Sequence, residues 1–358
     1  MGKVNVGVVG VGNCASSLVQ GVAYYSGHPE VTVGLPRRVC AGYDVADIRF
    51  TSAFDVDAGK VGADLSEALR CPPNNAAGFA DVGHLGVPVR DGVLADGLGP
   101  QAAERLRVRG RATVAEVAGH LRQTGTEVLL NLLPTGSQRA AEAYAEAALT
   151  AGCAYVNCMP AVLARSQTWA ARFRDAGLPL LGDDLKSQFG STLVHRALVQ
   201  ALAANGVELR NTYQLNHGGN MDFLTLQDPG RMATKARSKQ AGLAAGGTPP
   251  SPAGGNHVGT GYVPFLADRK VAYLRLEGTA FGGTEVAIDM RLTVEDSPSG
   301  AGAMLDAVRY AKAALLSRCP EIADAASTLL MKAPGTPTSE DAATAVLAGL
   351  SGPAGGRS

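Results

Sequence analysis

Residues 182–188, GDDLKSQ, bring two adjacent carboxylates, a lysine, a serine and a side-chain amide together between an apolar run and an apparent helix. A carboxylate beside an ammonium group can exchange protons and hold charge on a bound ligand. Aspartate and serine are also good helix N-caps, but that structural role accounts for one aspartate and leaves Lys186 unexplained. The stretch therefore predicts a functional site, which the surrounding elements must position.

A glycine-rich turn near the start of the chain could bind an anion. A β-branched strand over residues 4–9 runs into Gly10 and Gly12 of a GxGxxA pattern, and a helix follows. Glycine lets the backbone approach a pyrophosphate, and the helix N-terminus offers unpaired N–H groups. Asn13 and Cys14 fall in the same turn and are expected near the cofactor. A glycine turn made only for packing is the alternative.

Asp55 ends a second predicted strand, IRFTSAFD, and a helical stretch is expected from Lys60. A carboxylate at this place in a dinucleotide-binding fold binds the ribose diol and repels a 2′-phosphate, which favours NAD over NADP. The separation from the glycine turn exceeds the usual ~20 residues, because a loop-like stretch over residues 26–47 intervenes. An acid that only begins a helix is the alternative.

Three more strands are predicted over residues 126–134, 154–160 and 178–184, separated by alanine-rich helical stretches. This alternation predicts an α/β fold with a Rossmann-type, doubly wound parallel sheet. Ligands bind outside the carboxyl ends of such strands, which places GDDLK on the ligand side. Cofactor contacts are expected there from Pro134, Thr135, Gly136, Asn157 and Asp183.

A second, strand-rich region begins near residue 211. Residues 211–223, 271–281 and 284–296 alternate polar and apolar side chains, as strands with one buried face do. Between them, the Gly/Pro/Ala-rich residues 241–256 follow three cations in KARSKQ, which suggests either a closing lid or a plain connection. A capped helix is expected over residues 296–316, and Lys332 lies in an apolar segment after it.

Composition limits the class of ligand. The chain has 358 residues, 46% of them hydrophobic, and its 32 Lys and Arg balance its 32 Asp and Glu. We expect a small ligand, and neither nucleic acid nor a membrane, because no global field favours a polyanion. No signal peptide, long apolar run or CxxC pair is visible, so a cytoplasmic protein is expected. The histidines lack zinc-ligand spacing.

The motifs GVGNCASSL, AFDVDAGKVG, LPTGS, GDDLKSQ, LNHGGNMDF, DRKVAYLRLEG, EDSPSGAG and MKAP occur in this order between about residues 3 and 336. Together they resemble the myo-inositol-1-phosphate synthase family in its shorter bacterial and archaeal form. The resemblance implies an enzyme that uses NAD to cyclise glucose 6-phosphate without net redox change. The steps are oxidation at carbon 5, enolisation at carbon 6, aldol closure onto carbon 1 and reduction of the ketone.

The same resemblance assigns roles to residues, because each step places negative charge on an oxygen. The implied catalytic residues are Lys186, Lys239, Lys270, Lys332, Asp184 and Asp296. The implied sugar and phosphate contacts are Ser187, Gln188, Asn216, His217, Asn220 and Asp222, with a structural role for His217 as the alternative. Cys14 is expected beside the cofactor without nucleophilic chemistry.

We expect four parts of the chain: an NAD-binding domain over residues 1–190, an inserted α+β catalytic and oligomerisation domain over 191–295, a return to the first domain over 296–340, and a tail over 341–358. The resemblance implies a homotetramer. It is also compatible with a cation beside the nicotinamide, to which no ligands are assigned.

The chain departs from the family in the long loop over residues 26–47, in the Gly/Pro-rich residues 241–256, and most clearly in one further segment. HVGTGY, residues 257–262, is shorter than the family's HIGPSDY and lacks its Pro-Ser-Asp. A changed substrate is therefore an alternative: fructose 6-phosphate would close onto carbon 2 and give a five-membered cyclitol phosphate. The sequence is also compatible with a simple NAD-dependent sugar-phosphate dehydrogenase and with a non-catalytic NAD-binding regulator.

Overall fold

The computed structural model describes residues 2–231 and 256–351. Six parallel strands form one sheet in the order β5-β4-β1-β6-β7-β8. Their bounds are β1 Val4–Val9, β4 Ile48–Asp55, β5 Val89–Asp91, β6 Val128–Asn131, β7 Ala154–Asn157 and β8 Leu180–Leu181. Without the small hairpin of β2 (Val39–Cys40) and β3 (Tyr43–Asp44), this is the Rossmann order. The predicted doubly wound sheet is confirmed.

Helices cover both faces of this sheet, and each face has its own apolar cluster. One face is packed by α1 (Asn13–Gly27), α10 (Asp296–Ser317), α11 (Pro320–Leu330) and α12 (Glu340–Ala348). The other is packed by α4 (Val114–Gln123), α5 (Gln138–Ala151) and α6 (Gln167–Asp175). The strands are therefore buried on both sides, which explains their nearly continuous apolar sequence.

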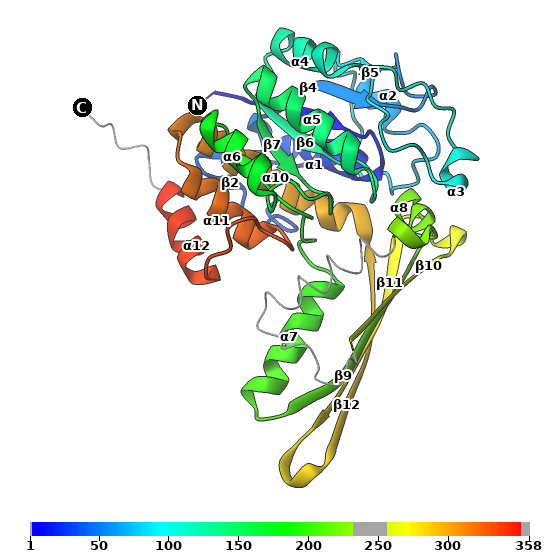
Figure 1. The fold of residues 1–358 in the computed structure, drawn as a ribbon, viewed down its shortest axis with the longest axis vertical. Coiled ribbons are helices and arrows are strands. Elements are labelled where there is room, and N and C mark those ends of the chain that lie inside the picture. Colours follow the sequence, from blue (N-terminus) through cyan, green and yellow to red (C-terminus); the bar gives the residue numbers. More distant parts are fainter. Residues whose placement is uncertain (1, 232–255, 352–358) are drawn as a thin grey trace.

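A second sheet has the order β10-β9-β11-β12, with bounds β9 Glu208–Gly218, β10 Asn256–Tyr262, β11 Arg269–Thr279 and β12 Glu285–Glu295. β9 pairs antiparallel with β11 and parallel with β10, and β11 pairs antiparallel with β12. Figure 1 shows these strands extending away from the first sheet, with α7 (Ser191–Ala204) beside them. Leu202 and Val199 of α7 pack on Leu276 of β11.

The remaining elements are short: α2 (Leu65–Ala68), α3 (Pro100–Ala103) and α8 (Met221–Thr225), with 3₁₀ turns at Val45–Asp47, Pro264–Leu266, Phe281–Gly283 and Gly349–Ser351. The helix expected from Lys60 is thus reduced to one turn, which Asp64 caps. The predicted tail also differs, because residues 341–348 continue α12, whose Ala343 and Leu347 are buried. Among the described residues, no helix is long and apolar enough to cross a membrane.

Candidate active site

A cavity of about 580 Å³ lies at the carboxyl ends of the parallel strands, where α7, α8, β11 and α10 meet them. Most of the residues singled out from the sequence line it. They are Gly10, Gly12, Asn13, Cys14, Asp55, Pro134, Asp184, Lys186, Ser187, Gln188, Asn220, Asp222, Lys270, Asp296 and Lys332. Segments from near both ends of the chain thus meet at one place.

The glycine turn is shaped for close approach of a ligand. Gly10 has a φ of +88°, and a Cβ there would lie 2.9 Å from the carbonyl oxygen of Leu132, so both conformation and space require glycine. Gly12 begins α1 without a side-chain cap. The first N–H groups of a 15-residue helix therefore face the cavity wall, as an anion site requires.

Asp55 ends β4 beside this turn. One of its carboxylate oxygens accepts from the Val11 N–H at 2.7 Å, and the other accepts from the N–H groups of Val56 and Asp57. These bonds fix the carboxylate next to the glycine turn, where the end of the second strand of a Rossmann fold is expected to hold a ribose.

Lys60 and Asn74, two residues that the sequence analysis did not assign to the site, stabilise the glycine turn by hydrogen bonds to its backbone. Lys60 is 3% exposed, and its ammonium group donates to the Val11 carbonyl at 2.8 Å and to the Asn74 amide oxygen at 2.9 Å. The Asn74 amide also donates to the Val11 carbonyl. The sequence could have pointed to Lys60 through the motif AFDVDAGKVG, in which it lies. It offered no such indication for Asn74, which lies in an irregular loop.

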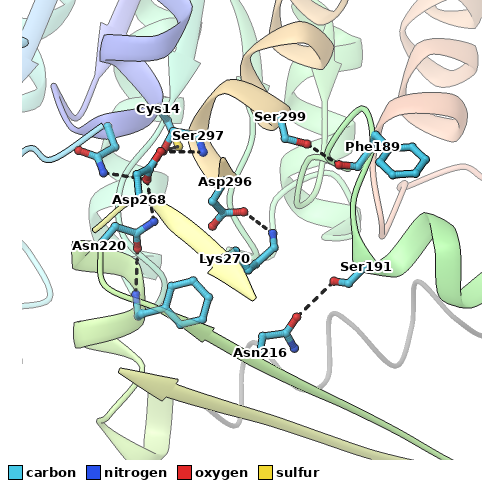
Figure 2. Close-up of polar contacts among 12 residues, drawn as sticks. Cys14, Phe189, Ser191, Asn216, Asn220, Asp268, Lys270, Asp296, Ser297 and Ser299 are labelled. Atoms are coloured by element: carbon cyan, nitrogen blue, oxygen red, sulfur yellow. Dashed lines mark hydrogen bonds and ion pairs between the residues drawn. The ribbon is translucent and has the colours of Figure 1, made fainter. Parts of the chain in front are cut away.

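Asp268 is a buried centre of hydrogen bonds that was also missed (Figure 2). Its Oδ1 accepts from the side chains of Asn13, Asn220 and Ser297 at 2.8, 3.0 and 2.9 Å. Burial raises the pKa of the Asp268 carboxyl. The carboxylate joins the glycine turn, the start of α8 and the start of α10, so it sets the spacing of three walls of the cavity.

Lys270, near the start of β11, and Asp296, at the start of α10, face one another, as Figure 2 shows. The ammonium group donates to the Asp296 carboxylate. Lys270 is the second residue of β11, and Asp268 lies in the turn just before this strand. One short segment therefore supplies a structural carboxylate beside the cavity and a cation on its wall.

Lys332 and Asp184 form a second ion pair on the cavity wall, with Nζ 2.7 Å from Oδ1. Asp184 is 2% exposed and has a φ of +61°, a left-handed conformation that is rare for a residue with a side chain. Such strain persists where the surroundings impose it, often at functional sites. The neighbouring Asp183 points elsewhere, so the two adjacent carboxylates have different environments.

Lys186 lines the cavity, and its side chain also contacts the C-terminal end of α11. Its ammonium group donates to the carbonyl oxygens of Thr328 and Leu329 at 3.0 and 3.1 Å, where the helix leaves carbonyls unpaired. The pKa of Lys186 is lowered to about 8, chiefly by burial, with the charge of Glu340 opposing the shift and those of Arg196 and Lys332 adding to it. The amine can therefore change protonation near neutral pH.

α7 begins at Ser191, so Ser187 and Gln188 precede the helix on the cavity wall. Its N-cap is Gly190, without a side-chain cap, and its first turn faces the cavity. Arg196, one turn further on, also lines the cavity, and its Nε is buried without a hydrogen-bond partner among the described residues. The start of α7 and the Arg196 guanidinium group thus form a cationic corner of the cavity, near which the sequence analysis singled out only Lys186, Ser187 and Gln188.

Several predicted contacts lie outside the cavity wall. Asp183 is fully buried, accepts from the Asn157 amide and backbone N–H groups, and has its pKa raised by burial. Asn157 is equally buried. Asn216 is 1% exposed and bonded to Ser191, and His217 is also absent from the wall. Of these four side chains, Asn216 bonds to a residue of the cavity wall, Ser191, whereas His217 packs against Tyr273. Lys239 lies outside the described residues.

Thr135 and Gly136 form the turn after β6 and are held by a residue that was not predicted. The Arg231 guanidinium donates to the carbonyl oxygen of Thr135 at 2.6 Å and to that of Gly97 at 3.4 Å. Gly136 has a φ of +92°, and a Cβ there would lie 2.7 Å from the Arg231 side chain. Arg231 lines the cavity, so it fastens two of its loops together.

Cys14 lies at the cavity next to Ser297. Burial, helped by the charges of Asp268 and Asp296, raises the pKa of its thiol to about 12. A thiol that keeps its proton is a poor nucleophile. Within residues 2–231 and 256–351, no group of three or more His, Cys, Asp or Glu side chains is arranged to hold a metal ion.

Comparison with known proteins agrees with the sequence motifs. The family model for Myo-inositol-1-phosphate synthase matches residues 190–297. Inositol-3-phosphate synthase of Mycolicibacterium smegmatis is 43% identical over 356 residues, which cover 97% of each chain. The enzyme of that name from Corynebacterium glutamicum is 42% identical, over 95% of this chain and 96% of its own.

Among solved structures, that of the protein named Ari2 is similar over 97% of this chain and 98% of its own, with a TM-score of 0.79 and 33% identity. The family inferred from the motifs is confirmed. Because similarity at this level extends over nearly the full length of both chains, this protein belongs to the myo-inositol-1-phosphate synthase family.

Proposed function

We propose that the protein catalyses the NAD-dependent cyclisation of glucose 6-phosphate to an inositol phosphate. Relatives that match nearly the whole chain are named inositol-3-phosphate synthase. The observation that carries the proposal is the meeting of Lys186, Lys270 and Lys332 on one cavity with the glycine turn. These lysines come from three separate parts of the sequence, and a nucleotide-binding fold alone does not require them.

The residues at the nucleotide end fit NAD. The close backbone approach at Gly10 and the uncapped start of α1 suit a pyrophosphate, and Asp55 suits a ribose diol while it disfavours a 2′-phosphate. When bound, NAD supplies the oxidant for carbon 5 and, once reduced, the reductant for the same carbon. The apolar Leu94 and Ala95 of the cavity wall lie beyond Asp55, where an adenine ring would be shielded.

The phosphate of the substrate fits the corner at the start of α7. The helix N-terminus attracts an anion, and Arg196 offers a guanidinium whose Nε has no partner within the described chain. Lys186 adds a second cation on the same wall. Phosphate held here fixes one end of the sugar, so that carbons 5, 6 and 1 lie toward Lys332 and Lys270.

The two ion pairs suit the chemical steps. Lys332 and Lys270 donate hydrogen bonds to the oxygens on carbons 5 and 1, where negative charge develops, and Asp184 and Asp296 hold the two ammonium groups in place. A lysine in its neutral amine form accepts the proton that leaves carbon 6 and, as an ammonium group, returns a proton to the oxygen on carbon 1 after the ring closes. The hydroxyl proton that the oxygen on carbon 5 loses on oxidation returns to that oxygen on reduction. The substrate and product are isomers, so no net oxidation occurs.

Fructose 6-phosphate remains a second candidate substrate because of one observation. Thr260, in the segment HVGTGY that departs from the family pattern, lines the cavity. A change at this wall alters the space around the sugar without touching the nucleotide end. The same residues would then close the ring onto carbon 2 and give a five-membered product.

The experiment is to incubate the purified protein with catalytic NAD⁺ and either sugar phosphate, and to identify the products by NMR. A six-membered cyclitol phosphate from glucose 6-phosphate supports the proposal, and a five-membered product from fructose 6-phosphate alone replaces it. Stoichiometric NADH accumulation would identify a simple dehydrogenase. Binding of NAD with no conversion of either sugar would identify a regulator.

Assembly as a homotetramer is part of the same proposal. The second sheet extends from the body of the molecule, with β12 at its edge, and offers a surface for another subunit (Figure 1). The mass of the particle in solution, measured by light scattering, tests this.

A further inference from the structure

Glu340, the first residue of α12, contacts two cations, Arg196 and Lys186, on the cavity wall at the start of α7. Its Oε1 lies 3.0 Å from Nη2 of Arg196 and 3.9 Å from Nζ of Lys186. Arg196 and Lys186 line the cavity, whereas Glu340 does not and is 56% exposed. The carboxylate therefore meets the two cations without occupying the space that the substrate would take.

α12 holds Glu340 in this place. The Ser339 hydroxyl accepts from the Ala342 N–H at 3.2 Å and caps the helix, while Leu347 is buried against the first domain. The preceding segment is fixed to α11, because the Thr338 N–H donates to the Thr328 hydroxyl at 3.2 Å. Thr328 also offers its carbonyl to Lys186. One short connection thus positions both Lys186 and its carboxylate partner.

The charges around Lys186 explain why a carboxylate matters here. Among the described residues, Arg196 and Lys332 are the cations that act on its ammonium group, and Glu340 is the anion. Two cations that must converge on one phosphate repel one another before the phosphate arrives. A carboxylate that bonds to one and faces the other offsets this repulsion and fixes the guanidinium plane.

We propose that Glu340 is a positioning residue for the substrate phosphate, which it serves by holding Arg196 and Lys186 together from outside the cavity. This inference rests on the proposed function, because it requires a phosphate at the start of α7. It concerns affinity for the phosphate end and leaves the steps at carbons 5, 6 and 1 unchanged. The competing explanation is that Glu340 only stabilises α12, because a negative charge at a helix N-terminus is favourable.

The test compares Glu340→Gln with Asp341→Asn, a matched loss of one charge on the next residue of the same helix, which is exposed. Glu340→Gln is expected to raise the KM for glucose 6-phosphate and the inhibition constant of inorganic phosphate by roughly two- to fivefold, as for a partly exposed ion pair. The kcat should stay unchanged, and Asp341→Asn should match the wild type in all three.

The pH profile supplies a readout that a structural role would not move. Removing the negative charge favours the neutral amine of Lys186, so the rise of KM on the alkaline side should begin at a lower pH in Glu340→Gln. If the wild type is active and Glu340→Gln has the same KM, the same inhibition constant for phosphate and the same pH profile, the role of Glu340 is overturned and the proposed function is not. A wild type that converts neither sugar phosphate would instead overturn the proposed function.

Discussion

Lys332 and Asp184 are joined twice. The ammonium group donates to the carboxylate at 2.7 Å, and the Lys332 backbone N–H donates to the Asp184 carbonyl oxygen at 2.7 Å. The backbone bond fixes the two segments, and the side-chain bond then fixes the ammonium group on the cavity wall. Residues 148 positions apart in sequence therefore form one rigid unit of the site.

Lys332→Met should lower the kcat of the cyclisation by roughly 10²- to 10⁴-fold, since it removes a group that stabilises charge and exchanges protons. NAD affinity should change little, because the glycine turn and Asp55 remain. Product formation by NMR and NAD titration by protein fluorescence measure the two effects. Lys312→Met is the control: this buried lysine bonds to Glu127 away from the cavity, so its loss should lower stability and spare kcat.

The KM for glucose 6-phosphate should rise as pH passes about 8, the pKa of Lys186. Burial lowers this pKa, so the amine is charged below that pH and neutral above it, and the neutral form no longer attracts the phosphate. Lys186→Arg should remove the rise, because a guanidinium stays protonated throughout. A wild-type KM that stays flat from about one pH unit below this pKa to about one unit above it would contradict the role of Lys186.

Asp268→Asn should weaken NAD binding by roughly tenfold, since it removes a buried charge-assisted hydrogen-bond acceptor. The three side-chain donors, Asn13, Asn220 and Ser297, all bond to Oδ1, whereas Oδ2 accepts from the Ser297 N–H at 3.1 Å. If the amide oxygen replaces Oδ1, the new NH₂ group faces the Ser297 N–H, a second donor. Calorimetric titration with NAD measures the change. Asp289→Asn, on the exposed side of β12, is the matched control and should bind NAD as the wild type does.

Gly136→Ala should destabilise the protein and weaken NAD binding together. Alanine in the left-handed region costs about 1–2 kcal/mol, and its Cβ would meet the Arg231 side chain at 2.7 Å. Arg231→Met alone should weaken NAD binding at unchanged backbone strain. In the double variant the two losses of affinity should be less than additive, which a double-mutant cycle detects; strict additivity would show that the two residues are uncoupled.

The sequence predicted those features that depend on local pattern. β4 could be located by its alternation and its terminal Asp55, and the strands of the second sheet by period two. It placed both Asp183 and Asp184 at the ligand, whereas only Asp184 lines the cavity, because the backbone turns the two adjacent carboxylates in different directions. The left-handed φ of Asp184 does this, and no residue preference at that position announces it.

Residues that act through tertiary contact were missed for a different reason. Glu340 and Arg196 carry no local signal, since an acid at a helix start or a cation in a helix is ordinary. Asp268 opens the motif DRKVAYLRLEG, but the motif does not show which side chains donate to its carboxylate. These contacts arise only when α12, α7, α8 and the turn before β11 come together. The assignment of residues 341–348 to a tail failed similarly, because a short helix gains its stability from the neighbour on which it packs.

α10 begins at the cavity with Asp296 and Ser297 and then fills the apolar layer over the first sheet, where Ala307, Val308 and Ala311 are fully buried. Of the helices α1, α10, α11 and α12 that pack on this face, only α1 belongs to the first 190 residues to leave the ribosome. Until residue 317 has emerged, the rest of that face is open to chaperones or to aggregation. A chain truncated in the second sheet would lack α10, and its nucleotide-binding domain would therefore not be stably folded. Neither domain is expected to fold stably until synthesis is nearly complete.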